Sequence, residues 1–137
     1  MKAKLKLIDK MKFAGINEAG QVTYFDAHKE SGGEDSAPTP MEVMLQTLAG
    51  CSAMDVISIL RKKKKTIENF EIILEAERSS EHPKVFTKVT MIYKLKSPDT
   101  VIEEFENAAA LSQEKYCSVS AMFKNSGCVV DYKTEIF

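Results

Sequence analysis

The apolar segment between residues 40 and 62 constrains the fold more than any other feature of the sequence. Thr39 can cap a helix, Pro40 suits the first helical position, and Glu42 can complete a capping box. The apolar residues that follow fall on nearly every side of such a helix: Val43, Met44, Leu45, Leu48, Ala49, Ala53, Met54, Val56, Ile57, Ile59 and Leu60. Because a helix that is apolar all round is buried in a core or an oligomer interface, the segment predicts a long, buried central helix.

Composition and charge narrow the cellular setting. Glu42, Gln46 and Asp55 interrupt the apolar segment, so we do not expect it to span a membrane. The N-terminus has no apolar core of a secretory signal. With 19 Lys and Arg against 20 Asp and Glu, charge gives no reason to expect a nucleic-acid or membrane partner. We expect one domain over residues 1–137, in the cytoplasm.

Period-two alternation predicts strands on both sides of the helix. The alternating segments are residues 1–8, 11–18, 21–27, 67–79 and 85–96. Further helical segments are expected from Ser97-Pro98 to Tyr116 and over 119–125, and a last strand over 128–137. The order predicts an α+β fold with two antiparallel β-sheet regions around the central helix.

Two cysteines lie in places that favour thiol chemistry. Cys117 is placed where one helical segment ends and the next begins, and the N-terminus of a helix favours a thiolate. Cys51 is in the middle of the long helix, so it needs a cation or hydrogen-bond donor from elsewhere. The alternative interpretation is that these cysteines are small buried hydrophobes, which we expect for Cys128. No C-x-x-C or H-x-x-x-H motif occurs, so we expect no metal site.

Two segments resemble the OsmC/Ohr family of thiol peroxidases: TPMEVMLQTLAGCSAMDVISIL and EKYCSVSAMF. The spacing from Pro40 to Cys51 is similar to that family's helix motif, and Cys117 with Ser120 is similar to its C-x-x-S context. EHPKVFTKV, residues 81–89, resembles a branch distinct from the best-known peroxidases. The resemblance implies an intertwined homodimer with its active sites at the subunit interface.

The resemblance also implies a chemistry for the two cysteines. Cys51 would attack an organic hydroperoxide, with alkyl or lipid hydroperoxides favoured by the apolar helix, and would become a sulfenic acid. Cys117 would resolve that acid as a disulfide. An external dithiol would reduce the disulfide, and no bound cofactor is expected.

The chain departs from the family pattern at the two groups that activate the thiolate. The family uses an arginine from the N-terminal strands and a glutamate directly after the helix-start proline. Here no arginine precedes Arg61, and Met41 follows Pro40. Arg78 and Glu42 are the candidate thiolate-stabilising residues, with a solvated charge and a helix cap as their respective alternatives. The departures favour a second function, an OsmC-like dimer without efficient peroxidase activity that binds a small apolar or thiol ligand.

Overall fold

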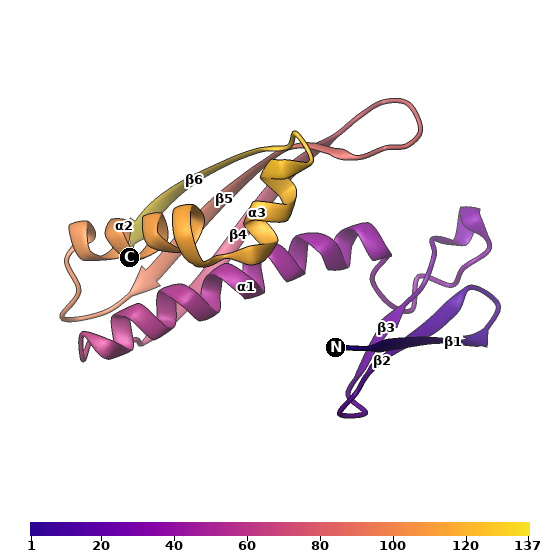
Figure 1. The fold of residues 1–137 in the computed structure, drawn as a ribbon, viewed down its shortest axis with the longest axis horizontal. Coiled ribbons are helices and arrows are strands. Elements are labelled where there is room, and N and C mark those ends of the chain that lie inside the picture. Colours follow the sequence, from indigo (N-terminus) through magenta and orange to yellow (C-terminus); the bar gives the residue numbers. More distant parts are fainter. The chain divides into compact units, whose positions relative to one another are not determined.

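The computed structural model describes all residues from Met1 to Phe137. It contains six strands and three α-helices, which confirms the predicted α+β class (Figure 1). The chain divides into two compact units, Met1–Gln46 and Thr47–Phe137. The long helix α1 (Pro40–Lys62) begins in the first unit and continues into the second.

The first unit is built on a three-stranded antiparallel sheet. Its strands β1 (Ala3–Asp9), β2 (Lys12–Asn17) and β3 (Val22–Phe25) are paired in that order and form one of the two predicted antiparallel regions. The alternation of apolar residues along β1 does not bury one face of this strand in the single chain, because Leu5 is 62% exposed and Leu7 is 60% exposed. Within the first unit, β1 packs against β2, and no helix covers the side chains of Leu5 and Leu7.

The loop that follows β3 is organised around the carboxylate of Asp26. That carboxylate accepts hydrogen bonds from the backbone N–H groups of Ala27, Glu34 and Ser36 and, at 2.6 Å, from the Ser36 hydroxyl. These donors hold the pKa of Asp26 at about 2. Gly33 completes the loop, since a Cβ there would collide with the carbonyl group of Ala27. The carboxylate thus ties together backbone that is distant along the loop.

The second unit contains a sheet of three strands with the helices on one face. The elements after α1 are β4 (Asn69–Arg78), β5 (Phe86–Lys96), α2 (Ile102–Leu111), the π-helical turn η2 (Ser112–Tyr116), α3 (Ser118–Asn125) and β6 (Val129–Ile136). The strand order is β4-β5-β6. β4 and β5 are antiparallel, whereas β6 is parallel to β5. The prediction of a fully antiparallel region is therefore wrong for β6, because α2, η2 and α3 form a crossover between β5 and β6.

The core of this unit lies between β5 and the helices. Val89, Met91, Tyr93 and Leu95 alternate along β5 and are fully buried. The ring of Tyr93 packs edge-on against Phe105 of α2, with centroids 6.4 Å apart. The buried residues of α1 are Leu48, Ser52, Val56 and Leu60.

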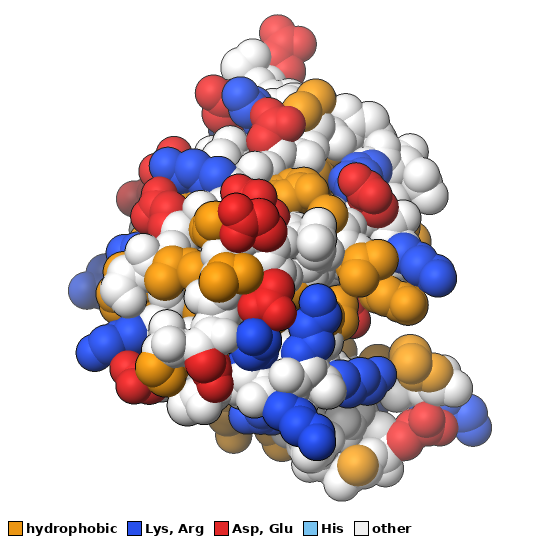
Figure 2. Space-filling model, turned by 90° about the vertical axis from the view of Figure 1, so that its left-hand side faces the viewer, with side chains coloured by type: hydrophobic (Ala, Val, Ile, Leu, Met, Phe, Trp, Pro, Cys, Tyr) orange, Lys and Arg blue, Asp and Glu red, His pale blue; other side chains and the backbone are white.

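The rest of α1 differs from the sequence prediction. The four-residue spacing of its buried positions places them on one stripe, so α1 is not buried all round in the single chain. Met54, on another side of the helix, is 76% exposed. Figure 2 shows hydrophobic side chains at the surface among charged ones. α1 is also long and apolar enough to cross a membrane, a property that core helices of soluble proteins share.

Candidate functional site

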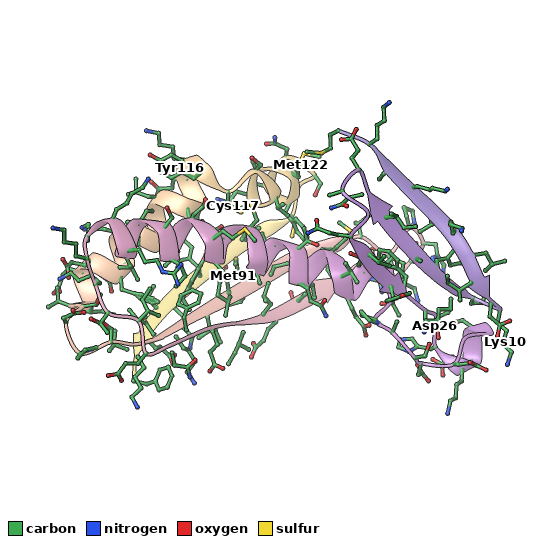
Figure 3. The ribbon with its side chains drawn as sticks, turned by 90° about the horizontal axis from the view of Figure 1, so that it is seen from below. Lys10, Asp26, Met91, Tyr116, Cys117 and Met122 are labelled. Atoms are coloured by element: carbon green, nitrogen blue, oxygen red, sulfur yellow. The ribbon has the colours of Figure 1, made fainter.

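The structure brings Cys51 and Cys117 together from different elements. Cys51 lies midway along α1 and is partly exposed, whereas Cys117 precedes α3 and is 4% exposed. The side chains of Cys51 and Cys117 lie close enough to interact electrostatically. Both cysteines are free. The more accessible thiol of the pair is therefore Cys51, and Figure 3 marks the position of the buried one, Cys117.

The local backbone explains the position of Cys117. The π-helical turn η2 ends at Tyr116, and Cys117 takes an extended conformation with φ −74° and ψ 99°. Its N–H donates to the Ser112 carbonyl at 2.7 Å. Its sulfur in turn accepts a hydrogen bond from the Ser120 N–H at 3.3 Å, so Cys117 is the N-cap of α3. The predicted break between two helices is confirmed at this residue.

The surroundings of Cys117 favour the protonated thiol. Burial is the largest cause, and the interaction with Cys51 and the charge of Asp55 act in the same direction. The Ser120 N–H opposes them, and the net effect raises the pKa of Cys117 to about 11. At neutral pH Cys117 is therefore a protonated thiol beside Cys51.

A buried network of polar side chains adjoins the two thiols. Ser52, the residue after Cys51, lies 2.5 Å from the Tyr93 hydroxyl and 2.7 Å from the Ser112 hydroxyl. The Gln113 side-chain nitrogen donates to Tyr93 at 2.7 Å and to Ser52 at 3.1 Å. Burial raises the pKa of Tyr93 to about 12, so its hydroxyl stays protonated. No buried side-chain nitrogen or oxygen in the chain lacks a hydrogen-bond partner.

The hydrogen bonds of this network run in one direction. Ser112 donates to the Asp55 carboxylate at 3.0 Å, so its single hydroxyl hydrogen is used there. Ser52 then donates to Ser112, and the shorter contact of the Tyr93 hydroxyl is with Ser52, at 2.5 Å, rather than with the Met91 sulfur at 3.9 Å, so Tyr93 donates to Ser52. Asp55 is one helical turn beyond Cys51 on α1, so the chain of hydroxyl groups ends on the same face of that helix.

Arg78 and Glu42, the candidate thiolate-stabilising residues, are engaged elsewhere. The Arg78 Nε donates to the Lys84 carbonyl at 2.8 Å, and its guanidinium lies 6.0 Å from the centre of the Phe86 ring. The Glu42 carboxylate accepts from the Thr39 N–H at 2.8 Å, which is one half of a capping box. These contacts fit the two alternative interpretations. The thiolate-stabilising role of either residue stays a prediction.

Cys128 lies outside this cluster. It is 4% exposed, and burial raises the pKa of its thiol. Its sulfur contacts the Val129 carbonyl at 3.6 Å. Cys128 therefore provides an internal control for the chemistry of the other two cysteines.

A groove next to the cluster offers room for a substrate. Its volume is about 290 Å³, and it is lined by Asp55, Ser58, Ile59, Lys62, Leu111 and Tyr116. The α1 residues of this lining continue the side of the helix that carries Cys51. Ile59, Leu111 and Tyr116 give the groove an apolar wall.

Sequence reasoning identified the two cysteines but missed the polar network around them. The residues of the network come from three different elements, and no spacing motif joins them: Ser52, Tyr93, Ser112 and Gln113. The signals available were a serine inside the apolar face of α1 and a glutamine before Cys117. Serine and glutamine are mostly exposed in proteins, so neither residue type by itself indicates a buried network.

Comparisons with known proteins agree over the length of the chain. A family model described as OsmC-like protein matches residues 33–133. Protein YhfA of Escherichia coli strain K12 is 36% identical over 126 residues, which cover 92% of this chain and 91% of that protein.

Solved structures are similar to this chain over nearly its whole length. A hypothetical protein from Aquifex aeolicus is 28% identical, with a TM-score of 0.79 over 99% of this chain and 96% of its own. The organic hydroperoxide resistance protein OhrB of Bacillus subtilis is 15% identical, with a TM-score of 0.61 over 100% of this chain and 98% of its own. At that identity the second likeness concerns the fold.

Proposed function

Because the chain belongs to the OsmC-like protein family, we propose that it reduces organic hydroperoxides with the Cys51–Cys117 pair. The observation that carries the proposal is the proximity of these two thiols, one partly exposed and the other buried. Such a pair has one sulfur that a substrate can reach and a second within range to close a disulfide. The name of the Bacillus subtilis structure, an organic hydroperoxide resistance protein, supports the same activity.

The proposed reaction has three balanced steps. The Cys51 thiolate attacks the peroxide bond of ROOH, takes one oxygen as a sulfenic acid and releases the alcohol ROH after proton transfer. The Cys117 sulfur then displaces hydroxide from the sulfenic acid, and its thiol proton leaves with that hydroxide as water. An external dithiol reduces the resulting disulfide by exchange, and the chain needs no bound cofactor.

The groove beside Asp55 supports an apolar substrate. Ile59 and Leu111 can accept an alkyl chain, and the polar side chains there are Asp55, Ser58 and Lys62. Burying alkyl groups contributes roughly 0.8 kcal/mol per methylene, which hydrogen peroxide cannot gain. We therefore propose alkyl or lipid hydroperoxides as the substrate class.

A second candidate function rests on the electrostatics of the site. The charge that acts on Cys117, besides Cys51 itself, is the carboxylate of Asp55, and the Arg78 guanidinium is occupied by the Lys84 carbonyl and Phe86. A carboxylate beside a thiol disfavours its ionisation. This arrangement favours a dimer with little peroxidase activity that binds a small apolar or thiol compound.

We also propose that the protein acts as a cytoplasmic homodimer. Four apolar side chains are between 45% and 76% exposed in the single chain: Leu5 and Leu7 of β1, and Met44 and Met54 of α1. Exposed apolar side chains on each of the two units favour interaction surfaces there, and a second copy of the chain is the occupant that the family implies. The apolar side chains of α1 that are exposed in the single chain would then be buried between the two chains.

Peroxide consumption tests the proposed function directly. Wild type and the Cys51→Ser and Cys128→Ser variants would be mixed with cumene hydroperoxide and dithiothreitol, with loss of peroxide followed over time. Wild type and Cys128→Ser should consume peroxide at similar rates, and Cys51→Ser at the rate of the dithiol alone. A wild-type rate equal to that of Cys51→Ser would overturn the peroxidase assignment and leave the binding function.

A further inference from the structure

We propose that Gln113 is a positioning residue that holds Cys117 at disulfide-forming distance from Cys51. Its part in catalysis rests on the proposed function, because it concerns the step in which the Cys51 sulfenic acid is resolved. The positioning of the two thiols by Gln113 would act in any reaction that forms the Cys51–Cys117 disulfide.

The Gln113 side chain connects the surroundings of both thiols. Its oxygen accepts from the Ser120 hydroxyl at 2.6 Å, and Ser120 is the residue whose N–H binds the Cys117 sulfur. Its nitrogen donates to Ser52, the residue that follows Cys51, at 3.1 Å. One buried amide thus spans α1 and α3 next to both sulfurs.

The shortest contacts of the network orient this amide. Tyr93 and Ser52 use their own hydrogens toward Ser52 and Ser112, so each can only accept from Gln113. The Ser120 hydroxyl donates to Gln113, which needs an acceptor there. Two donors on one side and an acceptor on the other are what an amide supplies, and neither leucine nor glutamate offers that set.

The backbone of Gln113 is fixed as well as its side chain. Lys124 of α3 donates to the Gln113 carbonyl at 2.8 Å, across the turn that contains Cys117. Gln113 lies in the π-helical turn η2, and such turns occur frequently at functional sites. The turn directs the side chain toward the sheet while the chain continues to Cys117.

Positioning matters here because Cys117 is a poorly ionised nucleophile. A thiol that is mostly protonated can still react rapidly when its partner is held against it, since effective concentrations of well-oriented groups reach about 10⁵–10⁸ M. Loss of the Gln113 contacts should let α3 and its cap move relative to α1. The two sulfurs would then meet less often, although each would keep its own chemistry.

The test measures the pairing of the thiols without peroxide. The Cys51–Cys117 disulfide would be equilibrated with mixtures of reduced and oxidised dithiothreitol, and the effective concentration of the two thiols derived from the oxidised fraction. Gln113→Leu would be compared with wild type and with Val89→Ala, a buried β5 variant outside the network. Tyr93→Phe keeps the ring but removes one partner of Gln113, and it serves if Gln113→Leu does not fold.

The outcomes decide the proposal independently of peroxidase activity. We expect the effective concentration to fall at least tenfold in Gln113→Leu and several-fold in Tyr93→Phe, and to change less than twofold in Val89→Ala. Equal falls in Gln113→Leu and Val89→Ala, or an unchanged value in both network variants, would overturn it. A wild type that consumes no peroxide but shows the expected order would reject the proposed function and keep this inference.

Discussion

The N–H of Ser120 donates to the Cys117 sulfur at 3.3 Å, so that a cysteine side chain caps α3 in the place usually taken by serine or aspartate. The same thiol interacts with that of Cys51. Because burial outweighs the capping N–H, Cys117 stays a thiol while Cys51 is the more accessible of the two. This asymmetry assigns the first and second steps of the proposed reaction to different sulfurs.

The order of oxidation can be checked by removing the second sulfur. In Cys117→Ser the sulfenic acid on Cys51 has no resolving thiol, so we expect one equivalent of cumene hydroperoxide to yield a stable sulfenic acid. Mass spectrometry after treatment with dimedone should find the adduct on Cys51. Cys51→Ser is the control and should give no adduct on Cys117. A dimedone adduct on Cys117 in that control would reverse the proposed roles.

Alkaline pH should destabilise the protein through Cys117. Its pKa of about 11 lies above the ordinary value of 9.0, so the folded state keeps a proton that the unfolded state loses between those values. Stability therefore falls as pH rises from 9 to 11, by at most about 1.4 kcal/mol per pH unit. Urea unfolding of the reduced protein should show a smaller fall in Cys117→Ser than in wild type.

Tyr93 supplies the control for that measurement. Burial raises its pKa from 10.0 to about 12, so its contribution has the same sign but begins one pH unit higher. Tyr93→Phe should therefore leave the slope between pH 9 and 10 intact. Parallel curves for wild type and Cys117→Ser across this window would contradict a raised Cys117 pKa in the folded protein.

The local signals in the sequence predicted the start of α1 but not that of α2. Thr39 and Glu42 form the expected reciprocal bonds, at 2.8 Å and 3.4 Å, because both partners lie within one helical turn. At Ser97-Pro98 the same style of signal was wrong, and α2 begins at Ile102. The Asp99 carboxylate there accepts from the backbone N–H of Thr66, a distant contact that holds the segment as a turn.

The candidate site divides in the same way. Cys51 and Cys117 were found through spacing that resembles a known family, and that spacing is visible along the chain. Gln113 was not found, because its five hydrogen-bonding partners belong to α1, β5 and α3. A buried amide and a surface amide have the same local sequence pattern, and tertiary contacts alone distinguish them. The parallel pairing of β6 escaped prediction for a related reason, since strand direction depends on the crossover.

The buried stripe of α1 should be intolerant of charge. Val56 is fully buried in the core of the second unit, so Val56→Asp places a carboxylate among apolar groups without a partner. We expect a loss of several kcal/mol in the free energy of unfolding, measured with urea. Val56→Ala is the milder comparison, since it removes packing without adding charge. A Val56→Asp protein as stable as Val56→Ala would contradict the packing of α1 against the sheet.

The exposed side of α1 should respond to charge in a different way. Met54 is 76% exposed in the single chain, so Met54→Asp should leave the fold of one chain intact. If a second copy covers this side, the carboxylate should prevent association. Sedimentation at micromolar concentration should then find a monomer with an unchanged circular dichroism spectrum. A wild-type monomer under the same conditions, or a Met54→Asp dimer of unchanged affinity, would count against Met54 in the interface.

Acid should release the loop that Asp26 organises. The pKa of Asp26 lies at about 2, below its ordinary value of 3.8, so its hydrogen bonds stabilise the folded loop at any pH above that range and are lost as pH falls toward 2. Asp26→Asn should reproduce the released state at neutral pH, because one side-chain oxygen that now accepts from Ser36 is replaced by a donor. Amide hydrogen exchange of Ala27, Glu34 and Ser36 should accelerate in this variant. Asp35→Asn is the matched control, since Asp35 is exposed and pairs with His28 instead. Equal exchange in Asp26→Asn and Asp35→Asn would mean that the Asp26 carboxylate does not hold the loop together.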